Sequence, residues 1–252
     1  MKSILQFSLF IAVLTFSSFC TAQQKSQNTT YVLVHGAWGG SWAFKKVDSI
    51  MTAHGNVVYR PSLTGQGERV HLASTNVNLS THIDDVVNMI LFEDIKDIVL
   101  MGHSYGGMVI TGVADRIPER IRKLIYLDAF LPVDGEAVFT SNPEGSSWLK
   151  QMEKDGMIVP PWVKPDQPVP KDVPQSVKTF TEAISLKNQK AQSLPAVYVL
   201  TVDPGKKPEE DSFYKFAERA KKRNFKYIEM IADHNPQWSK VDELVKVLEE
   251  NR

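Results

Sequence analysis

Residues 98–108 read IVLMGHSYGGM. An apolar run leads into a Gly-x-Ser-x-Gly turn centred on Ser104, and a helical pattern follows. This order is typical of a nucleophile elbow, a strand-to-helix turn so sharp that its central side chain projects from the backbone. The turn requires small residues two positions before and after the serine, which Gly102 and Gly106 provide. The helix directs its first N–H groups at the same point, so Ser104 is the candidate nucleophile.

Short apolar runs alternate with helical patterns on both sides of this elbow. The runs that predict strands are 31–34, 57–59, 97–101, 124–127, 196–201 and 225–230. The patterns that predict helices begin near 41, 80, 108, 209 and 238, with Ser80 as the expected N-cap of the second. The alternation predicts an α/β fold with a mostly parallel sheet and helices on both faces.

The alternation stops between about residues 132 and 195. Six prolines fall between 160 and 174, so no strand or helix is expected to pass through that segment. Short helices are predicted on either side of it, at 136–139, 146–152 and 177–186. We interpret 132–195 as a small cap inserted over the site in a single domain that spans 31–252.

The composition fits one domain and excludes some classes of partner. The chain has 252 residues, of which 42% are hydrophobic, enough for one large core. Its formal net charge is zero. No basic excess favours nucleic acid or an anionic membrane surface, so neither is expected as a partner.

The amino terminus predicts export. Lys2 precedes an apolar stretch at 4–19, and small residues follow up to Ala22. This is typical of a secretory signal peptide at 1–22, followed by a polar lead at 23–30. The stretch is too short and too interrupted for a good membrane span, so no stable span is expected after processing.

The rival interpretation is a lipoprotein acylated at Cys20, but the large Phe19 before it argues against that signal. Cys20 is the one cysteine of the chain. Cleavage after Ala22 would leave no disulfide, no thiolate nucleophile and no cysteine ligand for a metal. No metal or cofactor is expected.

A serine hydroxyl needs a base to become nucleophilic, and the base needs an orienting carboxylate. In a fold with this elbow the partners follow the serine in the order acid, then histidine. Of the six histidines, His234 alone follows Ser104, just past the last predicted strand. We therefore predict His234 as the base and His35 as a structural histidine that braces its loop.

Three aspartates are candidates for the acid. Asp203 ends the strand after the cap, Asp128 ends the strand before it, and Asp233 adjoins His234. Chain order and strand-end position favour Asp203 over Asp128. Asp233 is disfavoured because its side chain is expected to point away from the imidazole. Asp128 is then expected to hold the cap's entry loop or a substrate group.

The loop after the first strand, HGAWGG at 35–40, is expected to complete an oxyanion hole. Its glycines allow close backbone approach, so the N–H groups of Ala37 and Tyr105 are the predicted donors. Trp38 and Phe130 are predicted to line the pocket. Further wall residues are expected to be Tyr105, Trp148 and Trp162. Together they predict a small-molecule ester with an apolar group as substrate.

These motifs resemble the α/β-hydrolase superfamily, and within it the small branch of plant methylesterases, hydroxynitrile lyases and related bacterial esterases. The resemblance rests on HGAW at 35–38, LTGQGER at 63–69, GHSYGG at 102–107, DAFLP at 128–132, and Asp203 with His234. It implies an α/β-hydrolase fold without the first two strands of the eight-stranded core, a short cap and a cofactor-free site. It implies nucleophile, acid and base at Ser104, Asp203 and His234.

One departure separates the two activities of that branch. The lyases carry a threonine after the first-strand histidine and a lysine after the base, where this chain has Gly36 and Asn235. Without a cation beside His234, leaving cyanide has no electrostatic partner. We therefore predict carboxylic ester hydrolysis, with lyase-like or another non-ester activity as the alternative.

Overall fold

The computed structural model describes residues 28–252. The predicted signal peptide at 1–22, Cys20 included, and the lead up to residue 27 lie outside the described residues. The first strand begins at Thr30, one residue earlier than predicted.

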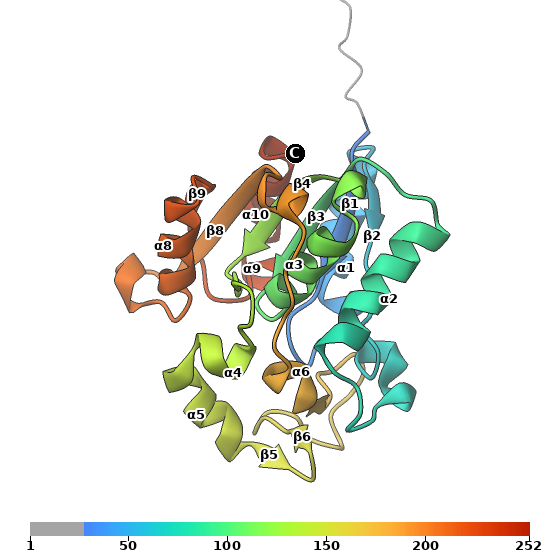
Figure 1. Ribbon diagram of the computed structural model, residues 1–252, viewed down its shortest axis with the longest axis vertical. Coiled ribbons are helices and arrows are strands. Elements are labelled where there is room, and N and C mark those ends of the chain that lie inside the picture. Colours follow the sequence, from blue (N-terminus) through green and yellow to red (C-terminus); the bar gives the residue numbers. More distant parts are fainter. Residues whose placement is uncertain (1–27) are drawn as a thin grey trace, which may run out of the picture.

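A six-stranded sheet forms the centre of the molecule, and all its strands are parallel (Figure 1). Its order is β2-β1-β3-β4-β8-β9. The strands are β1 Thr30–Val34, β2 Val57–Tyr59, β3 Ile98–His103, β4 Ile121–Leu127, β8 Ala196–Val202 and β9 Lys226–Ile231. Every residue of β3 is buried, as expected for an apolar strand in a parallel sheet that is covered on both faces. The predicted parallel α/β architecture is confirmed.

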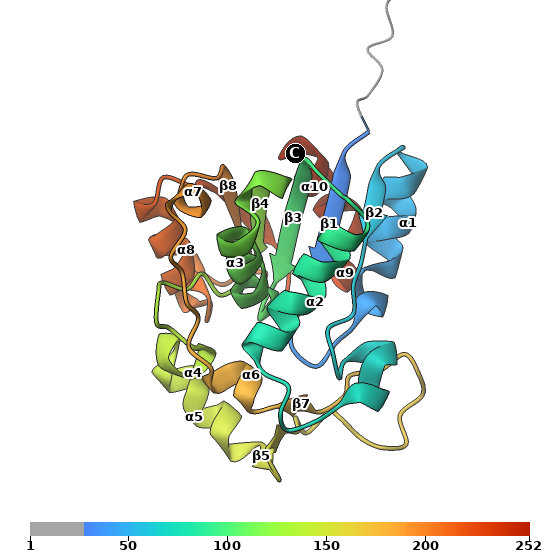
Figure 2. The same cartoon turned by 45° about the vertical axis from the view of Figure 1, so that its right-hand side comes forward.

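Helices cover both faces of this sheet. In Figure 2, α2 and α3 lie in front of the sheet and α10 behind it. The core is accordingly split into two apolar clusters, one under α2, α3 and α8 and the other under α1 and α10. The main helices are α1 Lys45–Ala53, α2 Leu79–Phe92, α3 Gly106–Arg116, α8 Tyr214–Lys222 and α10 Val241–Glu250. Short turns of helix are η1 Ser41–Phe44, η2 Gly67–Leu72, η3 Pro118–Arg120, η4 Pro208–Glu210 and α9 Pro236–Ser239.

The chain between β4 and β8 forms the cap. Most of it lies beyond the end of the sheet toward which the strands point, whereas its last part, before β8, returns beside α3 to the opposite end (Figures 1 and 2). Its helices are α4 Val138–Ser141, α5 Pro143–Gln151, α6 Lys178–Thr181 and α7 Gln189–Gln192. A small antiparallel sheet joins β5 Glu153–Lys154, β6 Met157–Ile158 and β7 Gln175–Ser176. Residues 160–174 carry no helix or strand, as predicted, whereas the three two-residue strands were not predicted.

The predicted cap of α2 is wrong by two residues. Asn78 is the N-cap, and its side chain accepts from the backbone N–H of Thr81 at 2.9 Å. Ser80 lies inside the first turn, where its N–H and hydroxyl donate to Glu182 of the cap at 2.7 and 2.9 Å. Residues 78 and 80 both have side chains that favour N-caps, so sequence preference does not distinguish them.

No helix of residues 28–252 is both long enough and apolar enough to cross a bilayer.

Candidate active site

Ser104 occupies a strained turn between β3 and α3. Its φ is 53°, a left-handed conformation that is rare outside glycine and is concentrated at functional sites. The turn is tight enough that a Cβ on Gly102 would lie 2.5 Å from the carbonyl oxygen of Gly106. A Cβ on Gly106 would lie 2.7 Å from the carbonyl oxygen of Val34. The predicted need for small residues around the serine is therefore confirmed.

His234 and Ser104, 130 residues apart in sequence, meet at the carboxyl edge of the sheet. The Nε2 of His234 lies 3.0 Å from the Oγ of Ser104. Its Nδ1 lies 2.6 Å from the Oδ2 of Asp128. The carboxylate accepts, so Nδ1 carries the hydrogen and Nε2 is left to accept the serine proton. The predicted approach of the histidine to the serine is confirmed.

The prediction that Asp203 orients this histidine is wrong. The carboxylate of Asp203 is 45% exposed and pairs with Lys206 at 2.7 Å. Asp128 occupies the position beside His234 that was predicted for Asp203. It is fully buried, and its other oxygen, Oδ1, accepts from the N–H of Thr201 at 3.3 Å. Both carboxylate oxygens of Asp128 are thus engaged inside the protein, which argues against the predicted contact with substrate or with the cap's entry loop.

Strand register explains why the earlier aspartate reaches the histidine. Asp128 follows the end of β4, and its N–H donates to Val199 of the adjacent β8 at 2.7 Å. Strand β8 continues to Val202, so Asp203 lies two positions beyond Thr201 and about 7 Å further out at the usual strand rise. The sequence did contain a signal, because Asp203 opens an Asp-Pro-Gly turn that is typical of exposed loops.

The imidazole of His234 is held between two rings. Phe213 stacks on it with centroids 5.0 Å apart and planes 9° from parallel. On another side lies His103, whose ring centroid is 4.7 Å away and whose Nε2 donates to the backbone carbonyl of His234 at 2.7 Å. Burial and the neighbouring His234 keep the pKa of His103 well below its usual value, so this ring stays neutral.

The loop after β1 comes close to the serine. A Cβ on Gly36 would lie 3.2 Å from the Cβ of Ser104. Within residues 28–252 neither Ala37 N–H nor Tyr105 N–H finds a hydrogen-bond acceptor, so both remain free to donate. His35 braces this loop as predicted: its Nδ1 donates to the carbonyl of Gly36 at 2.7 Å and its Nε2 accepts from the N–H of Leu63 at 3.1 Å.

Aromatic side chains connect the loop to the cap. The ring of half-buried Trp38 stacks on Phe180 at 5.8 Å and meets Trp162 edge-on at 5.6 Å. Trp162 in turn stacks on Trp148 at 5.9 Å, and both of these tryptophans are exposed. Phe130, predicted to line the pocket, is instead buried and packs on Phe213 at 5.2 Å.

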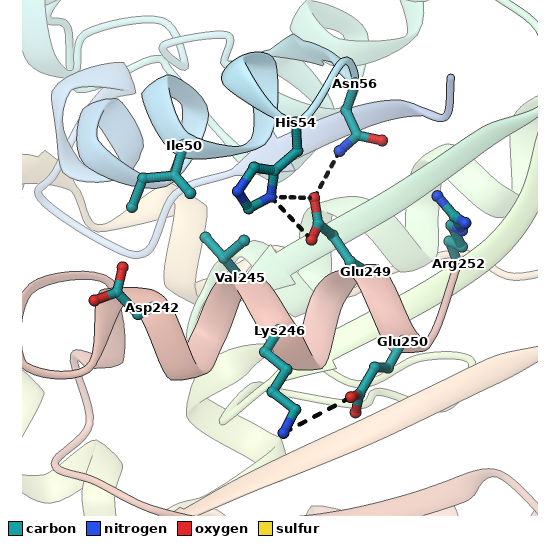
Figure 3. Close-up of a pocket in the computed structure, with 9 residues that line it drawn as sticks. All are labelled: Ile50, His54, Asn56, Asp242, Val245, Lys246, Glu249, Glu250 and Arg252. Carbon is teal, nitrogen blue, oxygen red and sulfur yellow. Dashed lines mark hydrogen bonds and ion pairs between the residues drawn. The ribbon is translucent and has the colours of Figure 1, made fainter. Parts of the chain in front are cut away.

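A separate hollow lies at the opposite end of the sheet, between α1 and α10 (Figure 3). There Glu249 accepts from Nδ1 of His54 at 3.0 Å and from the side-chain amide of Asn56 at 2.8 Å. These contacts tie α10 to the end of α1 and involve no residue of the Ser104 site. Within the described chain, no three His, Cys, Asp or Glu side chains gather in a group that could hold a metal ion.

The buried histidines predict a loss of stability in mild acid. Burial lowers the pKa of His35 and of His82 to about 4, whereas unfolded histidine titrates at about 6.5. Between these values the unfolded chain binds protons that the folded chain does not, so stability falls as pH falls. His103 acts in the same direction. Asp211 opposes them, because burial and nearby Asp128 raise its pKa to about 6, so the folded chain binds this proton first.

Burial also raises the pKa of the Asp172 carboxyl, which acts in the same direction as Asp211. Three histidines outweigh these two carboxyls, and each net proton is worth about 1.4 kcal/mol per pH unit. We expect the free energy of unfolding, measured with urea, to drop by several kcal/mol between pH 6.5 and 4.5. His82→Gln removes one of these titrating groups, so the slope of the unfolding free energy against pH should decrease by about 1.4 kcal/mol per pH unit. A urea midpoint that is constant across the window would contradict the expectation.

The chain is similar to a known protein family and to several characterised proteins. A family model described as the alpha/beta hydrolase family matches residues 31–247. A carbendazim hydrolyzing esterase of Nocardioides sp. (strain SG-4G) is 50% identical over 114 residues, 45% of this chain and 47% of that protein. Methylesterase 2 of Arabidopsis thaliana is 27% identical over 136 residues, 50% of this chain and 51% of that protein. This chain thus spans about half the length of the curated relatives it matches.

Among solved structures, one similar protein is an extracellular α/β-hydrolase from a Paenibacillus species, described as sharing structural and functional homology with tobacco salicylic acid binding protein 2. It superposes with a TM-score of 0.74 at 25% identity, over 88% of this chain and 98% of the other.

Proposed function

The chain belongs to the alpha/beta hydrolase family, and within that family we propose that it is a serine esterase. One observation carries the proposal. Ser104 Oγ, His234 and the buried carboxylate of Asp128 form a hydrogen-bonded chain, with distances of 3.0 and 2.6 Å. This constellation turns a neutral hydroxyl into a nucleophile.

In the proposed first step the Oγ of Ser104 attacks the carbonyl carbon of the ester while Nε2 of His234 removes its proton. Asp128 stabilises the imidazolium through the Nδ1 hydrogen bond. Negative charge develops on the former carbonyl oxygen, and the N–H groups of Ala37 and Tyr105 are proposed to receive it. The tetrahedral species then expels the alcohol, which leaves with the proton from His234.

Water completes the cycle. His234 removes a proton from a water molecule as that water attacks the acyl carbon, and the same two amides stabilise the second oxyanion. Collapse returns the proton to Oγ of Ser104 and releases the carboxylic acid. The stacked Phe213 ring and the Nδ1 bond to Asp128 keep the imidazole in one orientation through both steps, and the bond from His103 holds the backbone of His234.

The proposed substrate is a small ester with an apolar, aromatic group. Support comes from the aromatic side chain of Trp38, in the loop after β1, and from Phe180 and Trp162, whose rings pack against it. The names of the relatives in Nocardioides and Arabidopsis point in the same direction, toward a carbendazim-hydrolysing esterase and a methylesterase.

A lyase is the less supported alternative. Asn235 follows the base and has no charge to hold cyanide. Its side-chain oxygen accepts from Gln237 at 3.1 Å and its N–H donates to Asp233 at 2.8 Å. Neither contact brings a cation to the imidazole.

We also propose that the protein is exported, without a lasting membrane anchor. The basic and then apolar residues 1–22 support this proposal. The similar Paenibacillus hydrolase is extracellular, which agrees with this proposal.

Labelling by a fluorophosphonate tests the proposed function directly. An activated serine reacts covalently, so we expect one probe per chain, located on Ser104 by peptide mass spectrometry. The same preparation should hydrolyse p-nitrophenyl acetate and members of a panel with aromatic methyl esters and carbendazim. It should leave a cyanohydrin intact. Absence of both labelling and turnover on every ester would overturn the esterase proposal, and cleavage of the cyanohydrin would favour the lyase.

A further inference from the structure

We infer, on the basis of the esterase function proposed above, that Gln175 of the cap is a positioning residue for the oxyanion hole. Gln175 lies in β7, far along the chain from the loop HGAWGG at residues 35–40, here called the oxyanion loop. It touches neither the serine nor the histidine. It acts through Trp38, the residue next to the proposed donor Ala37.

Trp38 has a backbone conformation that its own chemistry disfavours. Its φ is 63°, in the left-handed region. A side chain in this region crowds its own backbone, and a large non-glycine residue there persists only where its surroundings hold it. The loop therefore needs an external restraint to keep this shape.

The cap supplies that restraint through both polar groups of the Trp38 backbone. The N–H of Trp38 donates to the side-chain Oε1 of Gln175 at 2.9 Å. The carbonyl of Trp38 accepts from the N–H of Val173 at 2.9 Å. Two bonds on opposite sides of one residue fix both of its peptide planes, and one of these planes is attached directly to the Cα of Ala37.

Gln175 is itself immobilised, which makes it an effective clamp. Its side chain is buried, with 1% of the residue exposed. Its Nε2 donates to the hydroxyl of Thr179 at 2.8 Å. Because the donor end is held by Thr179, the acceptor end is directed at Trp38. The carboxamide orientation is therefore set by both contacts together.

The same network reaches the second proposed donor. Thr179 is fully buried, and its hydroxyl also donates to the carbonyl of Ser176 at 2.8 Å, which fixes the turn that leads into α6. The neighbouring Phe180 packs against the Tyr105 ring at 5.6 Å. The cap segment from Gln175 to Phe180 thus contacts both Trp38, the residue after Ala37, and Tyr105. One short cap segment holds both sides of the oxyanion hole.

Kinetics of Gln175→Leu test this role. The change keeps the buried volume and removes the acceptor. We expect kcat for p-nitrophenyl acetate to fall about 10- to 100-fold with KM within twofold, because a loosened donor affects the transition state more than the bound substrate. Affinity for an alkyl boronic acid, whose adduct on Ser104 places an oxygen in the hole, should fall by a similar factor.

Gln175→Asn provides the same test if leucine prevents folding. It stays polar but is one methylene shorter, so its oxygen no longer reaches the Trp38 N–H, and a similar loss of kcat is expected. A double-mutant cycle tests the mechanism. Glycine accepts a φ of 63° without strain, so Gln175→Leu should cost less in a Trp38→Gly background than in the original protein.

The outcomes separate the inference from the function on which it rests. An original protein that neither labels nor hydrolyses esters overturns the esterase proposal itself. An active original protein with kcat unchanged in folded Gln175→Leu or Gln175→Asn overturns only the inference about Gln175. A rise in KM at constant kcat would also overturn that inference, because it would place Gln175 in substrate binding. An additive double-mutant cycle would overturn it as well.

Discussion

Replacing Asp128 by asparagine is expected to lower kcat/KM for a p-nitrophenyl ester by about 10⁴-fold while the protein remains folded. The carboxylate of Asp128 accepts from Nδ1 of His234 at 2.6 Å and from the N–H of Thr201 at 3.3 Å. An asparagine keeps its oxygen for the Thr201 N–H and turns its NH₂ group toward the imidazole. Nδ1 must then accept, so Nε2 carries the hydrogen and can no longer take the proton of Ser104.

Asp203→Asn is the matched control, because the chemical change is identical and the residue follows the adjacent strand. Its carboxylate is 45% exposed and pairs with Lys206, and exposed ion pairs of this kind contribute little. We expect kcat/KM within about twofold of the original protein. A large loss in Asp203→Asn together with a small one in Asp128→Asn would return the acid to Asp203.

The choice between Asp128 and Asp203 could not be made correctly from the sequence, whereas the other two members of the site could. The nucleophile was predicted from the Gly-x-Ser-x-Gly elbow around Ser104, and the base from residue order, since His234 is the one histidine after it. The acid was not, because β4 and β8 are neighbours and each is followed by an aspartate. The sequence predicts the end of a strand, and so the location of the residue after it, only to within a few residues. The three-dimensional register of the two strands decides which carboxylate lies level with the imidazole.

The cap illustrates a second limit. Its proline-rich segment at 160–174 was predicted to lack helix and strand, and it does. The two-residue strands on either side have no periodicity to detect, and their pairing comes from contacts between distant segments. The contact of Gln175 with Trp38 spans 137 positions. A single glutamine within a loop-rich stretch gives no sequence signal of such a contact.

The core, by contrast, was almost fully predictable. All six strands of the sheet overlap the apolar runs of the sequence. The inner strands are apolar because both faces of the sheet are covered there, whereas the edge strands β2 and β9 are partly exposed. Helix boundaries were less accurate. The helix predicted from 209 begins at Tyr214, because Pro208–Glu210 form a separate turn. Long periodic patterns identify an element well, whereas its first residue depends on local hydrogen bonds.

Ser104→Ala is expected to reduce ester hydrolysis by about 10⁴- to 10⁶-fold, with the far-ultraviolet circular dichroism spectrum unchanged. The hydroxyl is the atom that forms the acyl bond, and alanine fits the turn because the strain at φ 53° lies in the backbone. Ser193→Ala is a suitable control, since that exposed hydroxyl only donates to the carbonyl of Lys190. Hydrolysis that persists in Ser104→Ala at the original rate would remove Ser104 from the mechanism.

Ser104 and His234 are expected to act as one catalytic unit. If Oγ of Ser104 and Nε2 of His234 act as one unit across their 3.0 Å contact, His234→Ala should cost about as much as Ser104→Ala. The double variant should then fall no further than either single one, because removing either partner already abolishes the proton transfer. His54→Ala, at the opposite end of the sheet (Figure 3), controls for loss of an imidazole and should retain activity. Losses that multiply in the double variant would mean that the two side chains contribute separately, and the hydrogen-bonded relay would have to be abandoned.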